Sequence, residues 1–254
     1  MPKNATEDKY RAPALDKGLD ILELLSNQPK GMTRGEIVKA MGRSPSEIYR
    51  MIERLVVREY LFRSIEGDRY TLSMKLYLLG TQYPPQKRMV SQAQPLMDEF
   101  ADKTKQSIHL AAPNQGGLVV IAQASPPASW EFRLHMGTKL SLIGSGSGRT
   151  YLAFQTSEKR HELLANLKEN QDETFEISSV EKDVMAIHKA GYRTAPSKRL
   201  LGVTDISAPV IGIDGYAIAA LTCPYIERVD KVKGKNREET LEILQSVAEQ
   251  LSID

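Results

Sequence analysis

The strongest constraint on the fold is a pair of helix-start signals on either side of one glycine, close to the N-terminus. Thr33 with Glu36 three residues later has the pattern of a capping box, which predicts a short helix that ends before Gly42. Ser44 followed by Pro45 gives a second N-cap and a proline at the first helical position. Two helices joined by so short a turn are typical of a helix-turn-helix motif.

Apolar side chains at helical spacing extend this pair to a three-helix unit. One stripe begins at Ala14 and ends before Pro29, which predicts a helix ahead of the motif. In the helix that follows Ser44, positions i, i+3, i+4 and i+7 are apolar, as expected for a face packed on the first two helices: Ile48, Met51, Ile52 and Leu55. Its polar face is then free to enter a DNA major groove, which admits one helix.

A short hairpin follows the three helices. Residues 60–64 and 69–72 are predicted to be strands, joined by a charged turn that contains Gly67. Helix, helix, turn, helix and hairpin is the order of a winged helix-turn-helix. We therefore predict a DNA-binding domain over residues 13–76, preceded by a flexible arm at 1–12.

The candidate DNA contacts lie on the polar face of the third helix and at its start: Arg43, Ser44, Ser46, Glu47, Tyr49 and Arg50. The arginines suit phosphate or guanine, Ser46 and Tyr49 suit phosphate or base edges, and Glu47 suits a cytosine amino group. The alternative is an ordinary solvated helix face, and capping roles compete with base contact at Ser44 and Glu47. Thr33 and Arg34, at the start of the preceding helix, are expected to contact phosphate. Arg63 and Arg69 on the wing are expected to reach the flanking backbone or the minor groove.

The remainder of the chain has a different pattern. Residues 77–90 are predicted to be a linker, because Pro84–Pro85 stops an amphipathic stretch, and 91–254 an effector domain. There, strands are expected at 108–112, 118–122, 129–134, 203–210 and 216–223, and helices at 148–154, 157–167, 180–190 and 236–251. Strands and helices mix without a regular strand–helix–strand rhythm, which favours an α+β fold with an antiparallel sheet.

Composition excludes several classes. A lone cysteine rules out a disulfide framework, and the four histidines lack the i, i+4 spacing of a helical metal site, so no metal and no cofactor are expected. No signal peptide and no membrane span of about 20 apolar residues is visible, which predicts a cytoplasmic location. Residues 1–76 carry 14 Lys and Arg against 11 Asp and Glu, and the rest carries 20 against 21. Attraction to phosphate therefore belongs to the N-terminal part.

A glycine- and serine-rich run at 144–149 carries the candidate effector site. Arg149 stands where a dinucleotide fingerprint needs glycine, no P-loop lysine follows, and Gly146 stands where a nucleophile elbow needs serine. A glycine-rich turn that opens a helix nevertheless directs free N–H groups outward and forms a small anion site. We expect a carboxylate to bind at Gly146 and Ser147, with a plain structural loop as the alternative.

An acidic residue in an apolar strand extends this site. By strand alternation Val203 and Asp205 share one face. A carboxylate is costly to bury alone, so Asp205 either lies at a pocket wall or pairs with an arginine. Thr222 on the next strand is the other polar pocket candidate, and Met136 and Leu142 are expected to supply apolar wall.

Two separate stretches resemble the IclR family of bacterial regulators. The first is ALDKGLDILELLSNQPKGMTRGEIVKAMGRSPSEIYRMIERLVVREYL (14–61) with RYTLSMKLYLLG (69–80). The second comprises MGTKLSLIGSGSGRTYLAF (136–154) and AGYRTAPSKRLLGVTDISAPVIGIDGYAIAALTCP (190–224). The resemblance implies a GAF-like effector domain, a homodimer or dimer of dimers, and an inverted-repeat DNA operator. It also implies a small carboxylate effector such as an aromatic acid, a sugar acid or a short oxo-acid.

The chain departs from this family pattern at both sites. The family often has Lys in place of Pro45 and Thr in place of Glu47, which affects the operator sequence. It often has an acidic residue shortly after the Gly-Tyr pair, where this chain reads Gly191-Tyr192-Arg193-Thr194-Ala195. The missing acid and the extra Asp205 suggest an effector unlike the simplest oxo-acids.

The sequence thus predicts a DNA-binding transcriptional regulator of a catabolic operon, controlled by a small organic acid and without enzymatic activity. An enzyme with an accessory helix-turn-helix is the second hypothesis, weakened by the lack of a nucleophile–base–acid signature. A winged-helix module that binds proteins, with no ligand in its second domain, is the third. The sequence leaves open the effector, the operator and the choice between repression and activation.

Overall fold

The computed structural model describes residues 12–64, 68–82, 84–127, 132–170, 177–229 and 234–252. The chain divides into two compact units, Met1–Pro84 and Pro85–Asp254, and each is described by itself. Almost all of the arm expected at 1–12 and most of the turn expected at 65–68 lie outside the described residues.

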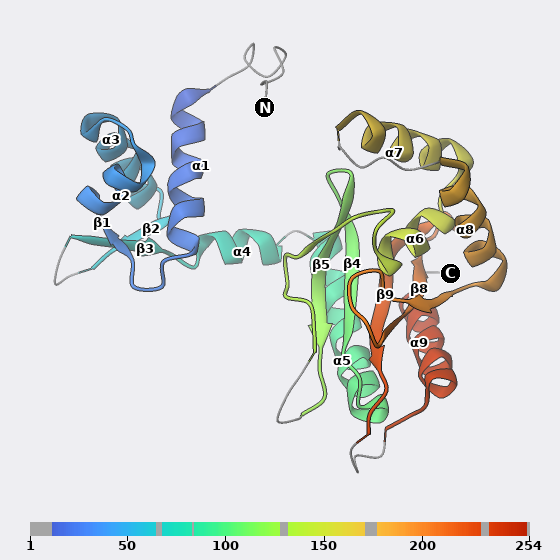
Figure 1. The fold of residues 1–254 in the computed structure, drawn as a ribbon. Helices are drawn as coiled ribbons and strands as arrows, with labels where there is room; N and C mark the ends of the chain where they lie inside the picture. Colours follow the sequence, from blue (N-terminus) through green and yellow to red (C-terminus); the bar gives the residue numbers. More distant parts are fainter. Residues whose placement is uncertain are drawn as a thin grey trace. The chain divides into compact units, whose positions relative to one another are not determined.

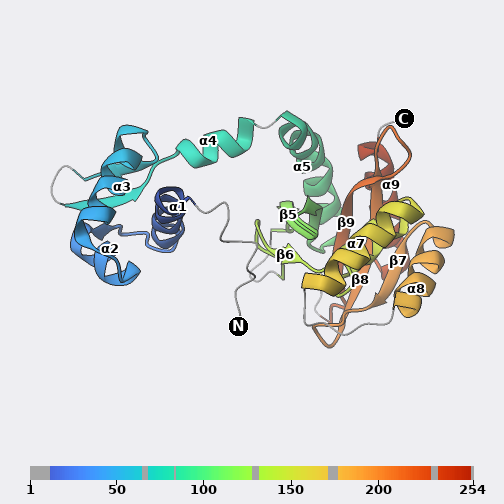
Figure 2. The same ribbon diagram turned by 90° about the horizontal axis from the view of Figure 1, so that it is seen from above.

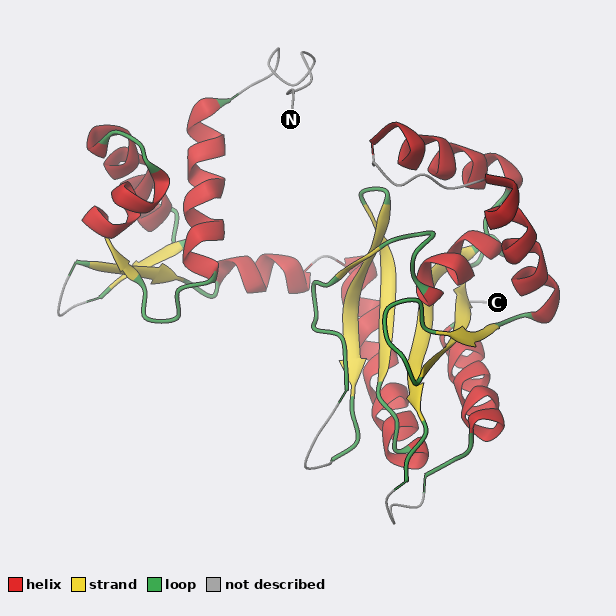
Figure 3. Ribbon diagram, viewed as in Figure 1, coloured by secondary structure: helices red, strands yellow, loops and turns green. Residues whose placement is uncertain are grey.

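The N-terminal unit combines helices with a small antiparallel sheet (Figures 1 and 3). Its described helices are α1 (Pro13–Ser26), α2 (Arg34–Met41), α3 (Pro45–Val57) and α4 (Lys75–Gln82). Its strands are β1 (Met32–Thr33), β2 (Leu61–Arg63) and β3 (Arg69–Leu72), in the order β1-β3-β2. The hairpin agrees with the predicted wing. The two-residue strand β1, which pairs with β3, was not predicted.

The turn between α2 and α3 has the predicted chemistry in most respects. The Glu36 N–H donates to the Thr33 hydroxyl at 3.2 Å, and the Thr33 N–H donates to the Glu36 carboxylate at 2.8 Å, which confirms the capping box. Gly42 ends α2 with a φ of 59°, a left-handed conformation that favours glycine. Ser44 occupies the N-cap of α3, but its hydroxyl accepts no N–H of that helix.

The core of this unit holds α3 by its inner face. Ile48 and Ile52 of α3 are completely buried against Ile21, Ile37 and Tyr70. Met51 and Leu55, expected to be buried, are partly exposed at the edge of this core. The packing therefore fixes which face of α3 points outward.

The C-terminal unit is built on one six-stranded antiparallel sheet of order β6-β5-β4-β9-β8-β7. Its strands are β4 (Ile108–Asn114), β5 (Gly117–Ala124), β6 (Lys139–Leu140), β7 (Arg193–Pro196), β8 (Val203–Ile211) and β9 (Ala217–Ile226). Its helices are α5 (Pro84–Thr104), α6 (Gly146–Ala153), α7 (Ser157–Asn170), α8 (Ile177–Ala190) and α9 (Arg237–Leu251). The predicted α+β class with an antiparallel sheet is confirmed.

Helices cover both faces of this sheet (Figures 1 and 2). On one face α5 and α9 form a core with the sheet, with Met97, Phe100 and Leu244 fully or almost fully buried. On the opposite face α6 lies across β8 and β9, with α8 packed beside it. The first turn of α6 is thereby placed directly over the middle of the sheet.

Three local predictions differ from the structure. Residues 132–134, expected in a strand at 129–134, are extended but unpaired, and 129–131 lie outside the described residues. Phe132 and Leu134 line a pocket instead of a sheet face. Strand β7 was missed because it is a short edge strand that ends in Pro196. The boundary between the two units falls inside the expected linker at 77–90, but this segment also holds the end of α4 and the start of α5, because proline suits the first turn of a helix.

A close backbone approach fixes the position of α6. A Cβ atom on Gly148 would lie 2.3 Å from the Ser141 carbonyl oxygen and 2.5 Å from the Cα atom of Leu142. Both neighbours are backbone atoms, which cannot rotate away. Only glycine lets α6 lie at this depth.

We expect Gly148→Ala to destabilise the C-terminal unit by about 1–3 kcal/mol or more, because overpacking must displace α6 from the sheet. Gly35→Ala, in open space within α2, is the matched control and should leave stability unchanged or raise it. Calorimetric unfolding of both variants checks the prediction. Equal stability of the two would contradict the packing argument.

Candidate functional site

The outward face of α3 is polar along its first two turns. Residues 43–47, 49 and 50 are all exposed, whereas Ile48 is buried and anchors the helix. This stretch contains every predicted contact of the third helix: Arg43, Ser44, Ser46, Glu47, Tyr49 and Arg50. The geometry that a groove-binding helix needs is present, because no described part of this unit covers that face.

The predicted cations differ in how far they are already engaged. Arg34 donates through Nε to the Tyr70 hydroxyl at 2.7 Å and pairs with Glu53 at 2.5 Å, and it stacks over Tyr49. Arg63 pairs with Asp68 at 2.8 Å, and Arg69 bonds to the Gly31 carbonyl at 2.9 Å and lies 3.4 Å from Glu36. Among the described residues, Arg43 and Arg50 make no such contact. These two are the cations most available to a new anion.

Two other predicted contacts hold internal roles. The Thr33 hydroxyl caps α2, as described above. Glu47 accepts from Lys17 of α1 at 2.7 Å, and Lys17, together with the Ser44 hydroxyl, lowers the pKa of the Glu47 carboxyl. Glu47 is therefore an ionised acceptor held in place by α1.

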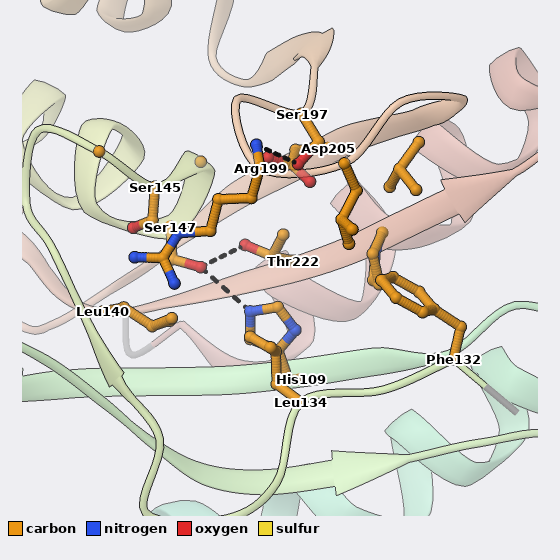
Figure 4. Close-up of a pocket in the computed structure, with 15 residues that line it drawn as sticks. His109, Phe132, Leu134, Leu140, Ser145, Ser147, Ser197, Arg199, Asp205 and Thr222 are labelled. Atoms are coloured by element: carbon orange, nitrogen blue, oxygen red, sulfur yellow. Dashed lines mark hydrogen bonds between the residues drawn. The ribbon is translucent and has the colours of Figure 1, made fainter.

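The C-terminal unit contains a pocket at the first turn of α6 (Figure 4). The empty space between its lining residues, including the part that is open to solvent, is about 550 Å³. Its floor comes from β4, β8 and β9, its rim from the segments after β5 and β7. Of the predicted effector contacts, Gly146, Ser147, Val203, Asp205 and Thr222 line it. Residues brought together from 146–147, 203–205 and 222 thus form one site.

The predicted apolar wall was misplaced. Met136 is 62% exposed and does not line the pocket, and Leu142 is buried in the core beneath α6. Gly137, with a φ of 81°, turns the chain between Met136 and β6, so Leu140 faces the pocket instead. Apolar wall comes from residues that the sequence analysis did not assign to it: Phe132, Leu134, Leu140, Leu200 and Pro224.

Several polar lining residues were also missed: His109, Ser145, Ser197 and Arg199. Strand alternation would have indicated Pro224 through Thr222, and the glycine-rich run contains Ser145. His109 had no local signal, because β4 is buried on both faces. It reaches the pocket because its strand pairs with β9 beside Thr222.

A chain of side-chain hydrogen bonds crosses the floor of the pocket (Figure 4). The Ser147 hydroxyl lies 3.2 Å from His109 Nε2 and 2.8 Å from the Thr222 hydroxyl. Thr222 is in turn 2.9 Å from the Ser207 hydroxyl. Burial lowers the pKa of His109 to about 4, so its ring is neutral at neutral pH. These four side chains therefore form a neutral, hydrogen-bonded part of the floor.

The start of α6 offers donors to an anion. Ser145 is its N-cap, and its hydroxyl accepts the Gly148 N–H at 3.0 Å. The Arg149 N–H donates to the Ser145 carbonyl. The N–H groups of Gly146 and Ser147 have no protein acceptor among the described residues. They lie at the positive end of the helix dipole, which favours a negatively charged ligand.

Charged residues surround this helix start. Burial raises the pKa of the Asp205 carboxyl, and the nearby Arg193 guanidinium lowers it. Arg149 is 8% exposed and pairs with Asp183 at 2.8 Å. Arg193, which the sequence analysis did not assign to the site, is also buried, and burial lowers the pKa of its guanidinium.

Other chemistries find little support in the described part of the chain. No cluster of three or more metal-ligating side chains occurs there. Cys223 is buried on the far side of β9 from Thr222, and burial raises the pKa of its thiol. No described helix is long and apolar enough to cross a membrane.

Comparison with known proteins agrees with both units. The model of the IclR helix-turn-helix domain matches residues 14–63, and that of the bacterial transcriptional regulator IclR C-terminal domain matches residues 82–253. The HTH-type transcriptional regulator BhcR of Paracoccus denitrificans is 24% identical over 222 residues, which cover 85% of this chain and 78% of BhcR. KdgR of Dickeya chrysanthemi is 23% identical, with coverage of 93% and 77%.

Solved structures show the same fold. The Thermotoga maritima IclR crystal structure superposes with a TM-score of 0.73 at 22% identity, covering 93% of this chain and 96% of that one. An IclR homolog from Microbacterium hydrocarbonoxydans, crystallised in complex with 4-hydroxybenzoate, gives 0.74 at 20% identity, with coverage of 94% and 97%.

A winged helix-turn-helix joined to an α+β domain with an internal pocket defines the class of DNA-binding transcriptional regulators that carry a ligand-binding domain. Within that class the chain belongs to the IclR family, whose two domain models together match most of its length. Its relatives are regulators and not enzymes, so the hypothesis of an enzyme with an accessory helix-turn-helix is dropped.

The neutral state of His109 predicts a pH dependence of stability. Its folded-state pKa of about 4 lies below the ordinary value of about 6.5, so the unfolded chain binds more protons between these values. This contribution is fully present above pH 6.5 and is lost as the pH falls toward 4, by about 3 kcal/mol at most.

We expect His109→Gln to reduce the loss of stability between pH 7 and pH 5, measured by urea unfolding at each pH. His135→Gln, at an exposed position, should keep the wild-type pH dependence. If His109→Gln also kept the wild-type pH dependence, the conclusion that the buried His109 ring is neutral would be wrong.

Proposed function

We propose that the chain regulates a catabolic operon by binding an inverted-repeat DNA operator as a homodimer, under the control of a small carboxylate effector. The observation that carries the proposal is the exposed polar face of α3, which is anchored from behind by Ile48 and Ile52. A helix presented in this way fits the major groove.

The available cations define the contact area. Arg43 lies just before α3, and Arg50 lies about one and a half turns into it. This is the part of the recognition helix that meets bases and phosphates in this motif. Glu47 lies between them, held by Lys17 as an acceptor for a cytosine amino group. Arg34, Arg63 and Arg69 can release their present carboxylate partners for phosphate, at the cost of those ion pairs.

The effector part of the proposal is supported by the pocket. A carboxylate placed at Gly146 and Ser147 receives two backbone N–H donors and the positive end of α6. The 4-hydroxybenzoate complex of the Microbacterium hydrocarbonoxydans homolog agrees with a small acid as the class of ligand. If the effector binds one conformation of the dimer more tightly than the other, it changes the distance between the two recognition helices. Operator half-sites about 34 Å apart fit only one of these distances.

Dimerisation is supported by apolar side chains that the N-terminal unit does not bury. Leu15 and Leu19 of α1 are 61% and 48% exposed and lie one helical turn apart. In α4 four consecutive residues, 76–79, are all large, apolar and exposed. A second copy of the chain is the partner that an isologous contact between such surfaces requires.

We expect Arg43→Ala and Arg50→Ala each to weaken DNA binding about tenfold or more at low salt. A phosphate contact would also lower the slope of log affinity against log salt by about 1. The measurement is an anisotropy titration on duplexes selected from a random-sequence library with the wild-type protein. Arg237→Ala, at an exposed position at the start of α9, is the control. Unchanged affinity in both variants would exclude α3 as the recognition helix.

The double substitution Leu15→Lys and Leu19→Lys should shift the protein from dimer to monomer and weaken operator binding, with no loss of folded structure because both side chains are exposed in the single chain. Sedimentation velocity measures the assembly state, and circular dichroism checks the fold. Ile213→Lys, 76% exposed in the turn between β8 and β9, should change neither. A double variant that stayed dimeric would remove α1 from the interface.

A further inference from the structure

Arg193 is a buried charged residue whose described surroundings do not satisfy its guanidinium group. It lies on β7, directly opposite Ser207 of β8, and is 7% exposed. Its Nε and Nη1 atoms are buried and have no hydrogen-bond partner in the described protein. Buried guanidinium groups are strongly destabilising unless an anion or several acceptors satisfy them.

The neighbouring carboxylates do not satisfy it. Asp183 is engaged by Arg149 at 2.8 Å, and neither Asp183 nor Asp205 forms an ion pair with Arg193 among the described residues. The Arg193 guanidinium instead lies immediately behind the first residue of α6. A Cβ atom on Gly146 would be 3.4 Å from its Nη1 atom. Its charge therefore adds to the positive end of the helix at the point where the N–H groups of Gly146 and Ser147 emerge.

Asp205 also lies beside Gly146, but it faces the pocket. It lines the pocket, and a Cβ atom on Gly146 would lie 3.1 Å from the Cβ atom of Asp205. A carboxylate bound at the start of α6 would thus have a second carboxylate within a few ångströms. Two like charges at that spacing repel each other, unless a donor lies between them or a cation offsets them.

The Arg193 cation is sealed behind Gly146, whereas Asp205 and a second cation, Arg199, both line the pocket. A ligand that carries only an acid group would meet the repulsion of Asp205 and would compete with Asp205 for the charge of Arg199. A ligand that also carries a hydrogen-bond donor on the carbon next to the acid group would place that donor against Asp205. The remaining wall is largely apolar, with Phe132, Leu134 and Leu140 at the pocket, and suits an aryl or branched alkyl side chain.

We propose that the effector is an acid with an adjacent hydroxyl or amino group and an apolar side chain, whose carboxylate binds at the start of α6 backed by Arg193 and whose donor binds Asp205. This inference rests on the proposed carboxylate effector and narrows it to 2-hydroxy or 2-amino acids. It makes Asp205 a specificity-determining residue and Arg193 a positioning residue, which acts through Gly146 without direct contact.

Two matched ligand series test the proposal by titration calorimetry on the full-length protein. The first is 3-phenyllactate, phenylalanine, phenylpyruvate and 3-phenylpropionate; the second is 2-hydroxy-4-methylpentanoate, leucine, 4-methyl-2-oxopentanoate and 4-methylpentanoate. Within each series only the group beside the carboxylate changes. In at least one series we expect the hydroxy or amino member to bind about tenfold or more tightly than the oxo and unsubstituted members. Comparison of the hydroxy acid with the amino acid in that series shows which of the two donors the site prefers.

Asp205→Ala should invert this preference. The variant should bind the favoured member about tenfold more weakly, and the unsubstituted acid more tightly than the wild type does, because a like charge has been removed. Asp214→Asn, at an exposed turn position of the same unit, is the control and should bind as the wild type does.

Arg193→Met separates a role in binding from a role in the fold. Without ligand it should keep or raise the melting temperature, because an unsatisfied buried charge is replaced by an apolar side chain. It should also weaken the favoured acid about tenfold. A lowered melting temperature of the free protein with unchanged affinity would make Arg193 a purely structural residue and overturn its part in the proposal.

The outcomes for the wild type separate this inference from the proposed function. Equal or tighter binding of the oxo or unsubstituted acids overturns the inference and leaves the carboxylate effector standing. Failure of all eight compounds to bind overturns the inference and removes support from the effector proposal as well, while DNA binding by α3 is measured independently.

Discussion

The depth at which α6 lies on the sheet is the constraint on which the C-terminal unit depends. Gly148 meets the backbone at Ser141 and Leu142 at distances that leave no room for a Cβ atom, and a Cβ atom on Gly146 would lie 3.0 Å from the Ser207 hydroxyl and 3.1 Å from the Cβ atom of Asp205. All eight residues of α6 are buried. A helix start that is normally solvated is thus held inside the protein, where a lower effective dielectric strengthens its attraction for an anion. The helix reaches that depth because Gly148 allows the backbone to approach so closely.

The two units use helix starts in opposite ways. In the N-terminal unit a buried isoleucine holds α3 by one face, so its first turns project outward with their cations free. In the C-terminal unit the first turn of α6 points inward onto a hydrogen-bonded floor made by His109, Ser147 and Thr222. One arrangement suits a large, highly charged polymer that stays outside the protein, and the other suits a small acid that must lose its water. Both follow from where the apolar residues of a short helix lie.

The sequence indicates those features that depend on local chemistry. The capping box at Thr33, the left-handed Gly42 and the apolar spacing of α3 are short-range signals, and the structure has all of them. Strand alternation similarly placed Val203 and Asp205 on one face of β8. Long-range partners were not accessible in this way. Met136 and Leu142 were expected to supply apolar wall, but Met136 is exposed and Leu142 is buried in the core beneath α6.

Arg193 shows why the electrostatics of the site needs the fold. In the sequence it follows a Gly-Tyr pair, where the missing family acid indicates an altered effector but does not show that Arg193 itself lies behind the pocket. Pairing of β7 with β8 sets it opposite Ser207, and the approach of α6 then closes it off from water. Because water no longer screens the Arg193 guanidinium, its positive charge adds to the electrostatic potential at the start of α6. The same burial leaves its Nε and Nη1 atoms without a hydrogen-bond partner among the described residues, so stability is lowered beside the proposed acid-binding position, as is common at functional sites.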